Sequence, residues 1–306
     1  MVERLNHLIE SQQLDKELLE SLFAEADFFK SNPKSDLLKG KVIATLFYEQ
    51  STRTRLSFES AALRLGASVI GTENAKEFSS VAKGESLEDT IRVISGYADC
   101  IVLRHFEEGA AKRAAVVSRV PIINAGDGKG QHPTQALLDI YTIEKELGRV
   151  NGLNIACVGD LASGRTVRSL CYLLGKFGGM SVTFVSPPNL RIGDDIKDYL
   201  TRHGVKFKEE TDLNHILPET DVVYLTRIQK ERISAADYEK AHGLYVINQE
   251  NFGLVRPDAR IMHPLPHVDE ISLPFETEQK DKRIAYFRQV DNGLYIRMAL
   301  LSHMLK

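Results

Sequence analysis

Hydrophobic and polar positions in the first half of the chain alternate between the pattern of a buried strand and that of an amphipathic helix. Helical spacing appears first, at Leu14, Leu18, Leu22 and Ala26. After it, the pattern predicts strands at 41–48, 67–71, 99–103 and 121–124, and helices at 52–65, 87–97, 107–119 and 133–147. Such alternation predicts a parallel sheet with helices on both faces.

The same pattern begins again after residues 148–152, which include two glycines. It predicts further strands at 153–158, 180–185, 221–226 and 260–262, and helices at 164–177 and 194–203. The last segment, 286–305, is apolar enough to be a buried helix. The sequence therefore predicts an α/β fold with two doubly wound parallel-sheet domains.

Length and composition agree with a globular protein of about two domains, since the chain has 306 residues. Its net charge of −3 argues against a nucleic-acid or membrane-surface partner. No apolar run approaches the ~20 residues of a membrane span, and residues 1–4 do not resemble a signal peptide. Cys100, Cys157 and Cys171 lie in apolar surroundings, as reduced core cysteines do. We expect a cytoplasmic protein, or an organellar one if a transit peptide was removed.

A cluster of donors lies where the strand at 41–48 meets the helix at 52–65. Ser51 suits the N-cap position, and Thr52, Arg53 and Thr54 fall in the first turn. A helix N-terminus presents unpaired backbone amides and favours anions, phosphate above all. The guanidinium of Arg53 adds a planar fork that fits two phosphate oxygens. The alternative is a capped helix with a solvated arginine.

Other polar residues follow predicted strands, where ligands bind in open α/β sheets. Arg104 ends the strand at 99–103, with His105 as its neighbour. His132 and Gln135 flank the start of the helix at 133–147, after a glycine-rich loop. Lys83 is the one cation in a small, polar segment at 77–86, where a surface lysine is the simpler interpretation.

The second half offers cations at strand ends. Gly159 and Gly164 lie five residues apart with Asp160 between them, which does not fit the dinucleotide-binding glycine fingerprint. Arg165, next to them, suits a carboxylate. Arg227 and Gln229 alternate after the strand at 221–226 and would share one face of an extended segment.

His263 and His267 lie four residues apart in the segment 262–270. The intervening Pro264 and Pro266 exclude the helix that would make the two histidines a metal pair. We therefore predict no metal site there.

The stretch 47–59 resembles the carbamoyl-phosphate signature of the aspartate/ornithine carbamoyltransferase family, Phe-x-x-x-Ser-Thr-Arg-Thr-Arg-x-Ser-Phe-Glu, and the resemblance extends over the whole chain. It implies catalytic roles for Arg53, Thr54, Lys83, Arg104 and His132. It implies that carbamoyl phosphate is bound by Ser51, Thr52, Arg53, Thr54, Ser79, Lys83, Arg104, His132, Gln135, Leu265 and Pro266. It implies that aspartate is bound by Lys83, Arg165, Arg227 and Gln229.

The resemblance also implies an architecture. A carbamoyl-phosphate domain would span 1–148 with the C-terminal helix 286–306 returning to it, and an aspartate domain would span 149–285, with an active-site cleft between them. The loop with Ser79 and Lys83 would reach a neighbouring subunit, so we expect a homotrimer with shared sites. A separate regulatory chain is a possible further partner. No cofactor is expected.

Two motifs favour aspartate as the acceptor, in an early step of pyrimidine synthesis. Thr-Arg-x-Gln at 226–229 and His-Pro-Leu-Pro at 263–266 are typical of the family's aspartate branch, whereas the ornithine branch has a cysteine in the second motif. His267 replaces the arginine common after it. The alternatives are an ornithine-specific enzyme, an NAD-dependent oxidoreductase and a phosphate- or nucleotide-binding regulatory protein without catalytic activity.

Overall fold

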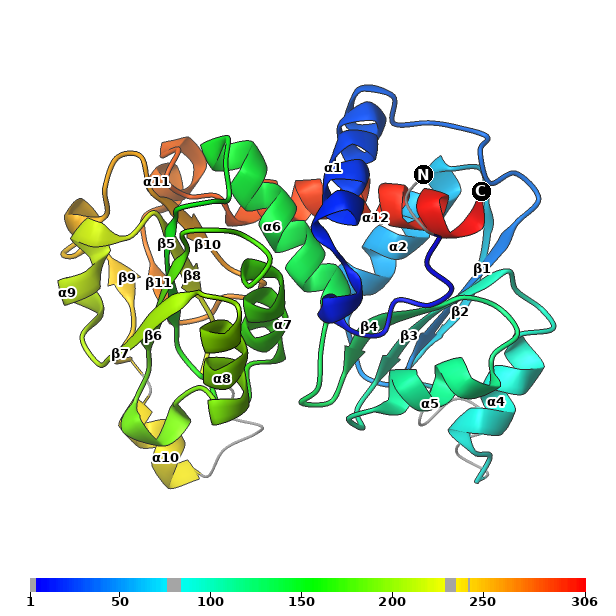
Figure 1. The fold of residues 1–306 in the computed structure, drawn as a ribbon, viewed down its shortest axis with the longest axis horizontal. Coiled ribbons are helices and arrows are strands. Elements are labelled where there is room, and N and C mark those ends of the chain that lie inside the picture. The colour runs from blue at the N-terminus through cyan, green and yellow to red at the C-terminus, as the bar shows by residue number, and fades with distance from the viewer. Residues whose placement is uncertain (1–3, 76–83, 229–234, 242) are drawn as a thin grey trace. The chain divides into compact units, whose positions relative to one another are not determined.

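The computed structural model describes residues 4–75, 84–228, 235–241 and 243–306 (Figure 1). The chain divides into two compact units. The first contains residues 1–141 and 291–306, and the second contains residues 142–290. Each unit is built around its own sheet, in which all strand pairs are parallel. The predicted fold class, α/β with two parallel-sheet domains, is confirmed.

The first unit has a four-stranded sheet in the order β2-β1-β3-β4. Its strands are β1 (Val42–Phe47), β2 (Ser68–Glu73), β3 (Cys100–His105) and β4 (Ile122–Asp127). Its helices are α1 (Lys16–Ser31), α2 (Thr52–Arg64), α4 (Leu87–Ile94), α5 (Ala110–Val117) and the first part of α6 (Pro133–Leu147). In Figure 1, α4 and α5 lie on one face of the sheet and α1 and α2 on the other.

The chain ends in the first unit. Helix α12 (Tyr286–Leu305) supplies residues 291–305 to it. The Arg4 side chain donates to the Met304 carbonyl at 2.9 Å, and Ser302 Oγ donates to Glu25 on α1 at 2.5 Å. These contacts tie the C-terminal helix to the N-terminal part of the same unit.

The second unit has a five-stranded sheet in the order β10-β8-β5-β6-β7. These strands are β5 (Asn154–Val158), β6 (Ser181–Val185), β7 (Lys206–Glu210), β8 (Val222–Leu225) and β10 (Arg260–Met262). A two-stranded sheet pairs β9 (Ile247–Asn248) with β11 (Ile271–Ser272). The helices are α7 (Arg165–Leu174), α8 (Asp194–Arg202), α9 (Leu213–Ile216), α10 (Ala235–Ala241) and α11 (Phe275–Lys280).

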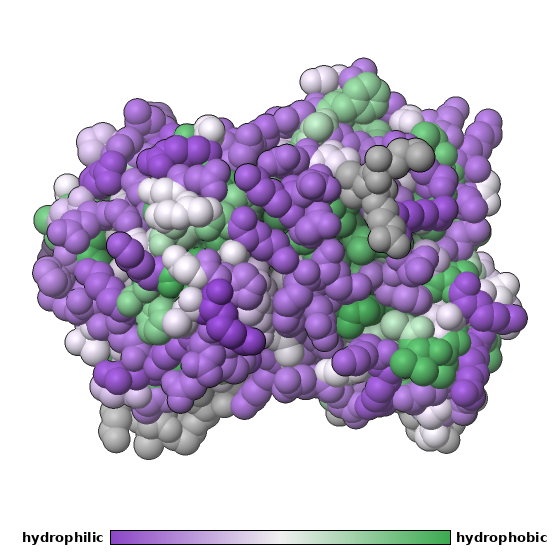
Figure 2. All heavy atoms as spheres, viewed as in Figure 1, coloured by the Kyte–Doolittle hydropathy of each residue, from purple (hydrophilic) through white to green (hydrophobic). Residues whose placement is uncertain are grey.

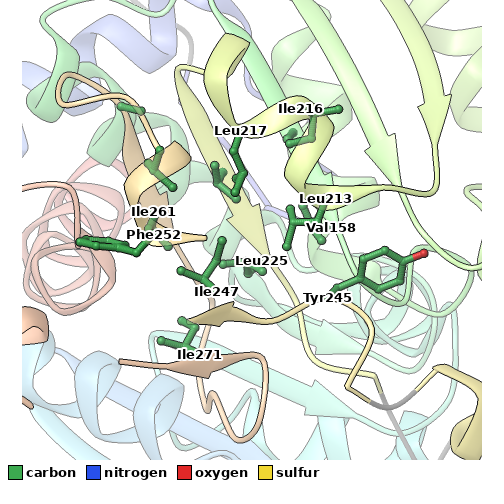
Figure 3. Close-up of a cluster of buried hydrophobic side chains, with 14 of the residues drawn as sticks. Val158, Leu213, Ile216, Leu217, Leu225, Tyr245, Ile247, Phe252, Ile261 and Ile271 are labelled. Atoms are coloured by element: carbon green, nitrogen blue, oxygen red, sulfur yellow. The ribbon is translucent and has the colours of Figure 1, made fainter. Parts of the chain in front are cut away.

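Short 3₁₀ helices complete both units, at Ser11–Gln13, Pro188–Leu190, Leu217–Glu219 and Phe252–Leu254. One hydrophobic core of the second unit joins its two sheets (Figure 3). In it, Val158 and Leu225 from the large sheet pack with Leu213 of α9 and with Ile247 and Ile271 of the small sheet. All five side chains are buried, so this cluster fixes the strand ends from which the candidate site residues project.

The strands and helices predicted from periodicity are all present, with ends that shift by a few residues. The sequence pattern did not predict several elements of the second unit, namely β7, α9, α10, β9, β11 and α11. Strand β7 reads Lys-Phe-Lys-Glu-Glu and lies at the edge of its sheet, where polar side chains face solvent and remove the apolar signal. The others have two to seven residues, too short to show a period.

Candidate active site

The turn between β1 and α2 is the place where the sequence predicts an anion-binding feature. Strand β1 is buried almost throughout and ends at Phe47. Ser51 occupies the N-cap position of α2, as predicted, but its hydroxyl makes no capping hydrogen bond. That hydroxyl and the first-turn amides are therefore available to a ligand. Thr52 is exposed, whereas Thr54 is only 7% exposed and faces the protein interior.

Two arginines in this turn differ in their surroundings. Arg55 is held by two carboxylates, Glu59 at 3.3 Å and Glu73 at 2.8 Å. Arg53 is exposed, and among the residues that the structure describes no carboxylate pairs with it. Partial desolvation lowers the pKa of Arg53 from its ordinary value. Arg53 is thus the cation of this turn that an incoming anion would meet.

Arg104 joins this turn through the parallel register of β1 and β3. The Tyr48 amide donates to the Arg104 carbonyl at 2.9 Å, so the turn and the end of β3 lie at the same sheet edge. The guanidinium is 12% exposed, pairs with Glu49 at 2.9 Å and donates to the Ala125 carbonyl at 3.2 Å. An anionic ligand at this arginine would therefore compete with Glu49.

His132 and Gln135 approach the same edge from the loop that follows β4. Asp127 closes that loop by accepting from the amides of Gly109 at 3.1 Å and Gln131 at 3.0 Å. His132 is buried directly before α6, with Nδ1 3.2 Å from Thr134 Oγ1. When the Thr134 hydroxyl donates to Nδ1, the imidazole proton lies on Nε2.

Gln135 is also buried, in the first turn of α6. Its side-chain amide donates to Asp139 Oδ1 at 2.9 Å. His105, the neighbour of Arg104, contacts residues of its own loop. Its Nδ1 accepts from the Glu107 amide at 3.0 Å, and its ring stacks on Phe106.

In the second unit, the glycines that follow β5 serve close packing. A Cβ at Gly159 would lie 2.1 Å from the Thr226 carbonyl oxygen, and one at Gly164 would lie 2.5 Å from the Asp160 carbonyl oxygen. Gly159 also has φ of +117°. Asp160 caps the turn by accepting from the Ser163 amide at 2.9 Å. These glycines are thus required by the backbone, independently of any nucleotide.

The candidate carboxylate ligands lie at the ends of this unit's strands. Arg165 is the first residue of α7 and is 8% exposed. Arg227 follows β8 and lines a pocket together with Tyr238, Asp269 and Glu270. The pocket thus holds a cation with two carboxylates, so a dicarboxylate entering here would meet repulsion as well as attraction.

The loop after β10 is held by an ordered histidine. His263 is buried, and its Nδ1 accepts from the Leu265 amide at 2.8 Å. The proton therefore lies on Nε2, which is 2.8 Å from Glu270 Oε1. Leu265 has φ of +56°, a left-handed conformation unusual for a leucine, and precedes a cis bond to Pro266. The histidine thus stabilises the backbone whose carbonyls, at Leu265 and Pro266, the sequence assigns to ligand binding.

His267, the departure from the family pattern, lies beside residues of its own unit. Its ring is 5.3 Å from that of Tyr286, and its Nε2 is 3.9 Å from Glu278. Of the remaining predicted site residues, Ser79, Lys83 and Gln229 lie outside the described residues.

The supporting carboxylates were not predicted. Glu49, Asp139 and Glu270 each hold a predicted ligand or the histidine beside one. Only the contact of Asp139 could have been inferred from the sequence, because Gln135 and Asp139 are four residues apart on a helix and so share a face. Nothing comparable marked Glu49 or Glu270.

Two further features concern membrane spans and metal sites. Within the described ranges, no helix is long and apolar enough to cross a membrane. Over the same residues, no group of three or more His, Cys, Asp or Glu side chains could hold a metal ion.

The fold and the site define an α/β protein with donors for an anion at a helix start in one unit and with candidate carboxylate-binding arginines in the other. Comparison with known families identifies it further. Residues 6–145 match the carbamoyl-P binding domain, and residues 151–304 the Asp/Orn binding domain, of aspartate/ornithine carbamoyltransferases. The chain belongs to the aspartate/ornithine carbamoyltransferase family.

The chain is similar to named aspartate carbamoyltransferases and to solved structures of such enzymes. The chain is 56% identical to aspartate carbamoyltransferase 3, chloroplastic, of Pisum sativum, over 99% of this chain and 78% of the relative. It is 49% identical to the catalytic subunit of Methanocaldococcus jannaschii aspartate transcarbamoylase, whose structure matches with a TM-score of 0.88 over 98% of both chains. Aspartate transcarbamoylase from Trypanosoma cruzi, solved with N-(phosphonacetyl)-L-aspartic acid, matches with 37% identity and a TM-score of 0.92, over 98% of this chain and 96% of that one.

The contrast between Arg53 and Arg55 gives a matched pair of variants. Arg53→Ala should weaken the binding of inorganic phosphate about 10–100-fold, the effect of losing one charge-assisted contact. Arg55→Ala should change it less than about threefold, because Arg55 already pairs with Glu59 and Glu73. Isothermal titration calorimetry measures both. Equal losses in the two variants would show that Arg53 contributes only general positive charge.

Proposed function

We propose that this protein transfers the carbamoyl group of carbamoyl phosphate to the amine of L-aspartate, giving N-carbamoyl-L-aspartate and phosphate. The observation that carries the proposal is the convergence of donors at one edge of the first sheet. There the start of α2 follows β1, Arg104 lies near the end of β3, and His132 follows β4; the three strands are adjacent and parallel. Relatives named for this activity match nearly the whole chain.

The chemistry requires positioning and charge stabilisation, without a covalent intermediate. The aspartate amine attacks the carbonyl carbon, a C–N bond forms, and the bond from carbon to the phosphate oxygen breaks. Thr54, Arg104 and His132 polarise the carbonyl oxygen and stabilise the negative charge that develops on it. Ser51, Thr52 and Arg53 hold the departing phosphate, together with Arg104 and with Ser79 and Lys83 of a neighbouring chain. The phosphate itself accepts the amine proton.

The remaining residues orient the two substrates. Gln135 accepts from the carbamoyl amine, as do the Leu265 and Pro266 carbonyls. Arg165, Arg227, Gln229 and Lys83 bind the aspartate carboxylates. Transfer requires the aspartate amine to meet the carbamoyl carbon. Of the two amino acids that the family uses, aspartate is favoured because Arg227 suits a second carboxylate and would repel the ornithine ammonium.

We further propose a homotrimer in which neighbouring chains share sites. Hydrophobic side chains on the first unit support self-association. Leu56 and Leu63 of α2 and Ile70 of the edge strand β2 are exposed, Leu63 to 62%. Figure 2 shows hydrophobic patches reaching the surface over the part of this unit that carries α4 and α5. Burial between chains would remove this apolar surface from water. A cytoplasmic location stays a prediction.

An assay of phosphate release tests the acceptor directly. With carbamoyl phosphate, the purified protein should release phosphate in the presence of L-aspartate but not of L-ornithine. Arg227→Ala should weaken the use of aspartate by about 2–5 kcal/mol, the typical effect of losing one partner of a buried charged contact. It should leave carbamoyl-phosphate binding nearly unchanged. Release driven by ornithine alone would overturn the assignment of the acceptor.

Mixed oligomers test the shared site. Arg53→Ala and Lys83→Ala chains should each be inactive, but a trimer refolded from both contains one junction with an intact Arg53 and an intact Lys83. Such mixed trimers should recover about one third of their sites, as head-to-tail symmetry requires. The measurement is activity per trimer after the mixed species have been separated. Background activity in verified mixed trimers would mean that each chain uses its own Lys83.

A further inference from the structure

A buried polar chain in the first unit links the candidate carbamoyl ligand Gln135 to the C-terminal helix. The Gln135 side-chain amide donates to Asp139 Oδ1 at 2.9 Å, one turn further along α6. Asp139 is fully buried. Arg297, on α12, is 4% exposed and electrostatically coupled to Asp139. A buried carboxylate thus accepts from the candidate ligand Gln135, and a buried guanidinium acts electrostatically on that carboxylate.

Arg297 keeps its positive charge although it is buried. Burial lowers the pKa of Arg297 to about 10, while the attraction of Asp139 opposes the decrease. Arg297 therefore keeps its charge at neutral pH. Its guanidinium also lies 5.2 Å from the ring centroid of Phe58, a buried residue of α2. A buried cation favours the ionised form of a neighbouring carboxyl, and the Gln135 side-chain NH₂, which can only donate, lies 2.9 Å from Asp139 Oδ1.

A carboxylate decides which way the glutamine amide points. Ionised Asp139 can only accept hydrogen bonds, so Gln135 must turn its NH₂ group towards it. The amide oxygen Oε1 then points to the other side. In the part of the chain that the structure describes, no donor bonds to Gln135 Oε1. The side chain thus presents an acceptor, and the buried carboxylate of Asp139 holds it in that orientation.

We propose that Asp139, supported by Arg297, is a positioning residue that makes the site selective for acyl phosphates whose acyl group carries an amine. The inference rests on the proposed function. The carbamoyl NH₂ would donate to Gln135 Oε1, whereas a methyl group in its place has nothing to donate. Acetyl phosphate is the matched probe, because it replaces the amine by a methyl group of similar size. The reaction is otherwise unchanged, giving N-acetyl-L-aspartate and phosphate.

Asp139→Asn removes the carboxylate that orients Gln135, with little change of side-chain volume. The side-chain amide that it introduces can donate to Gln135, which allows the Gln135 amide to rotate and turn its NH₂ group towards the carbamoyl NH₂. The variant should lose about 10–100-fold in kcat/KM for carbamoyl phosphate, as expected when donors face one another unpaired. The kcat/KM for acetyl phosphate should change less than about threefold. The ratio of the two values is the diagnostic quantity.

Glu146→Gln is the matched control. Glu146 is another carboxylate of α6, and it binds Arg260 at 2.8 Å and Arg288 at 2.6 Å. Its substitution removes a carboxylate of the same helix, with its ion pairs, without touching Gln135. We expect the ratio of carbamoyl to acetyl transfer to stay at the wild-type value in this variant, even if its thermal stability falls.

Gln135→Leu keeps the proposal testable if Asp139→Asn does not fold. It removes the acceptor directly and should reduce the ratio as much as Asp139→Asn does. Equal loss of carbamoyl and acetyl transfer in Asp139→Asn, or wild-type preference in Gln135→Leu, would overturn the inference. A wild-type protein that transfers neither acyl group to aspartate would instead refute the proposed function.

Discussion

In the proposed function, the first unit has to hold the multiply charged phosphate by electrostatic attraction and hydrogen bonds. The solution is a helix N-terminus at the carboxyl edge of a parallel sheet, where unpaired amides and the helix dipole favour an anion. Ser51 leaves its hydroxyl out of the cap, and Arg53 stays without a carboxylate partner among the described residues. Arg104 and the loop before α6 lie at the same edge, because β3 pairs with β1 and β4 pairs with β3.

Within each unit, carboxylates contact the candidate ligands or the residues beside them. Glu49 pairs with Arg104, Asp139 accepts from the Gln135 amide, and Glu270 lies 2.8 Å from Nε2 of His263. Each sets the direction in which a donor or an acceptor points. Such preorganisation matters for a reaction that depends on stabilising charge, because donors already aimed at the developing oxyanion need no reorganisation during the reaction.

Much of this could be predicted from the sequence because the determinants are local. The turn at 51–54 needs only a strand, a helix start and four residues in order, and periodicity predicts both parallel sheets. The supporting carboxylates could not be predicted, because Glu49 reaches Arg104 only after two strands have paired. The same holds for Arg297, which is distant in sequence from Asp139 and meets it only through the return of α12 to the first unit.

In the proposed function, one set of groups holds the phosphate and another holds the aspartate, so that the aspartate amine meets the carbamoyl carbon. Calorimetric titration with N-(phosphonacetyl)-L-aspartic acid tests it most directly, since the compound joins a phosphonate to aspartate. The compound should bind at least about 100-fold more tightly than phosphonoacetate or aspartate alone, as joining two ligands at a shared site predicts. Arg53→Ala and Arg227→Ala should each reduce that affinity. An affinity no greater than that of phosphonoacetate, unaffected by Arg227→Ala, would contradict the account.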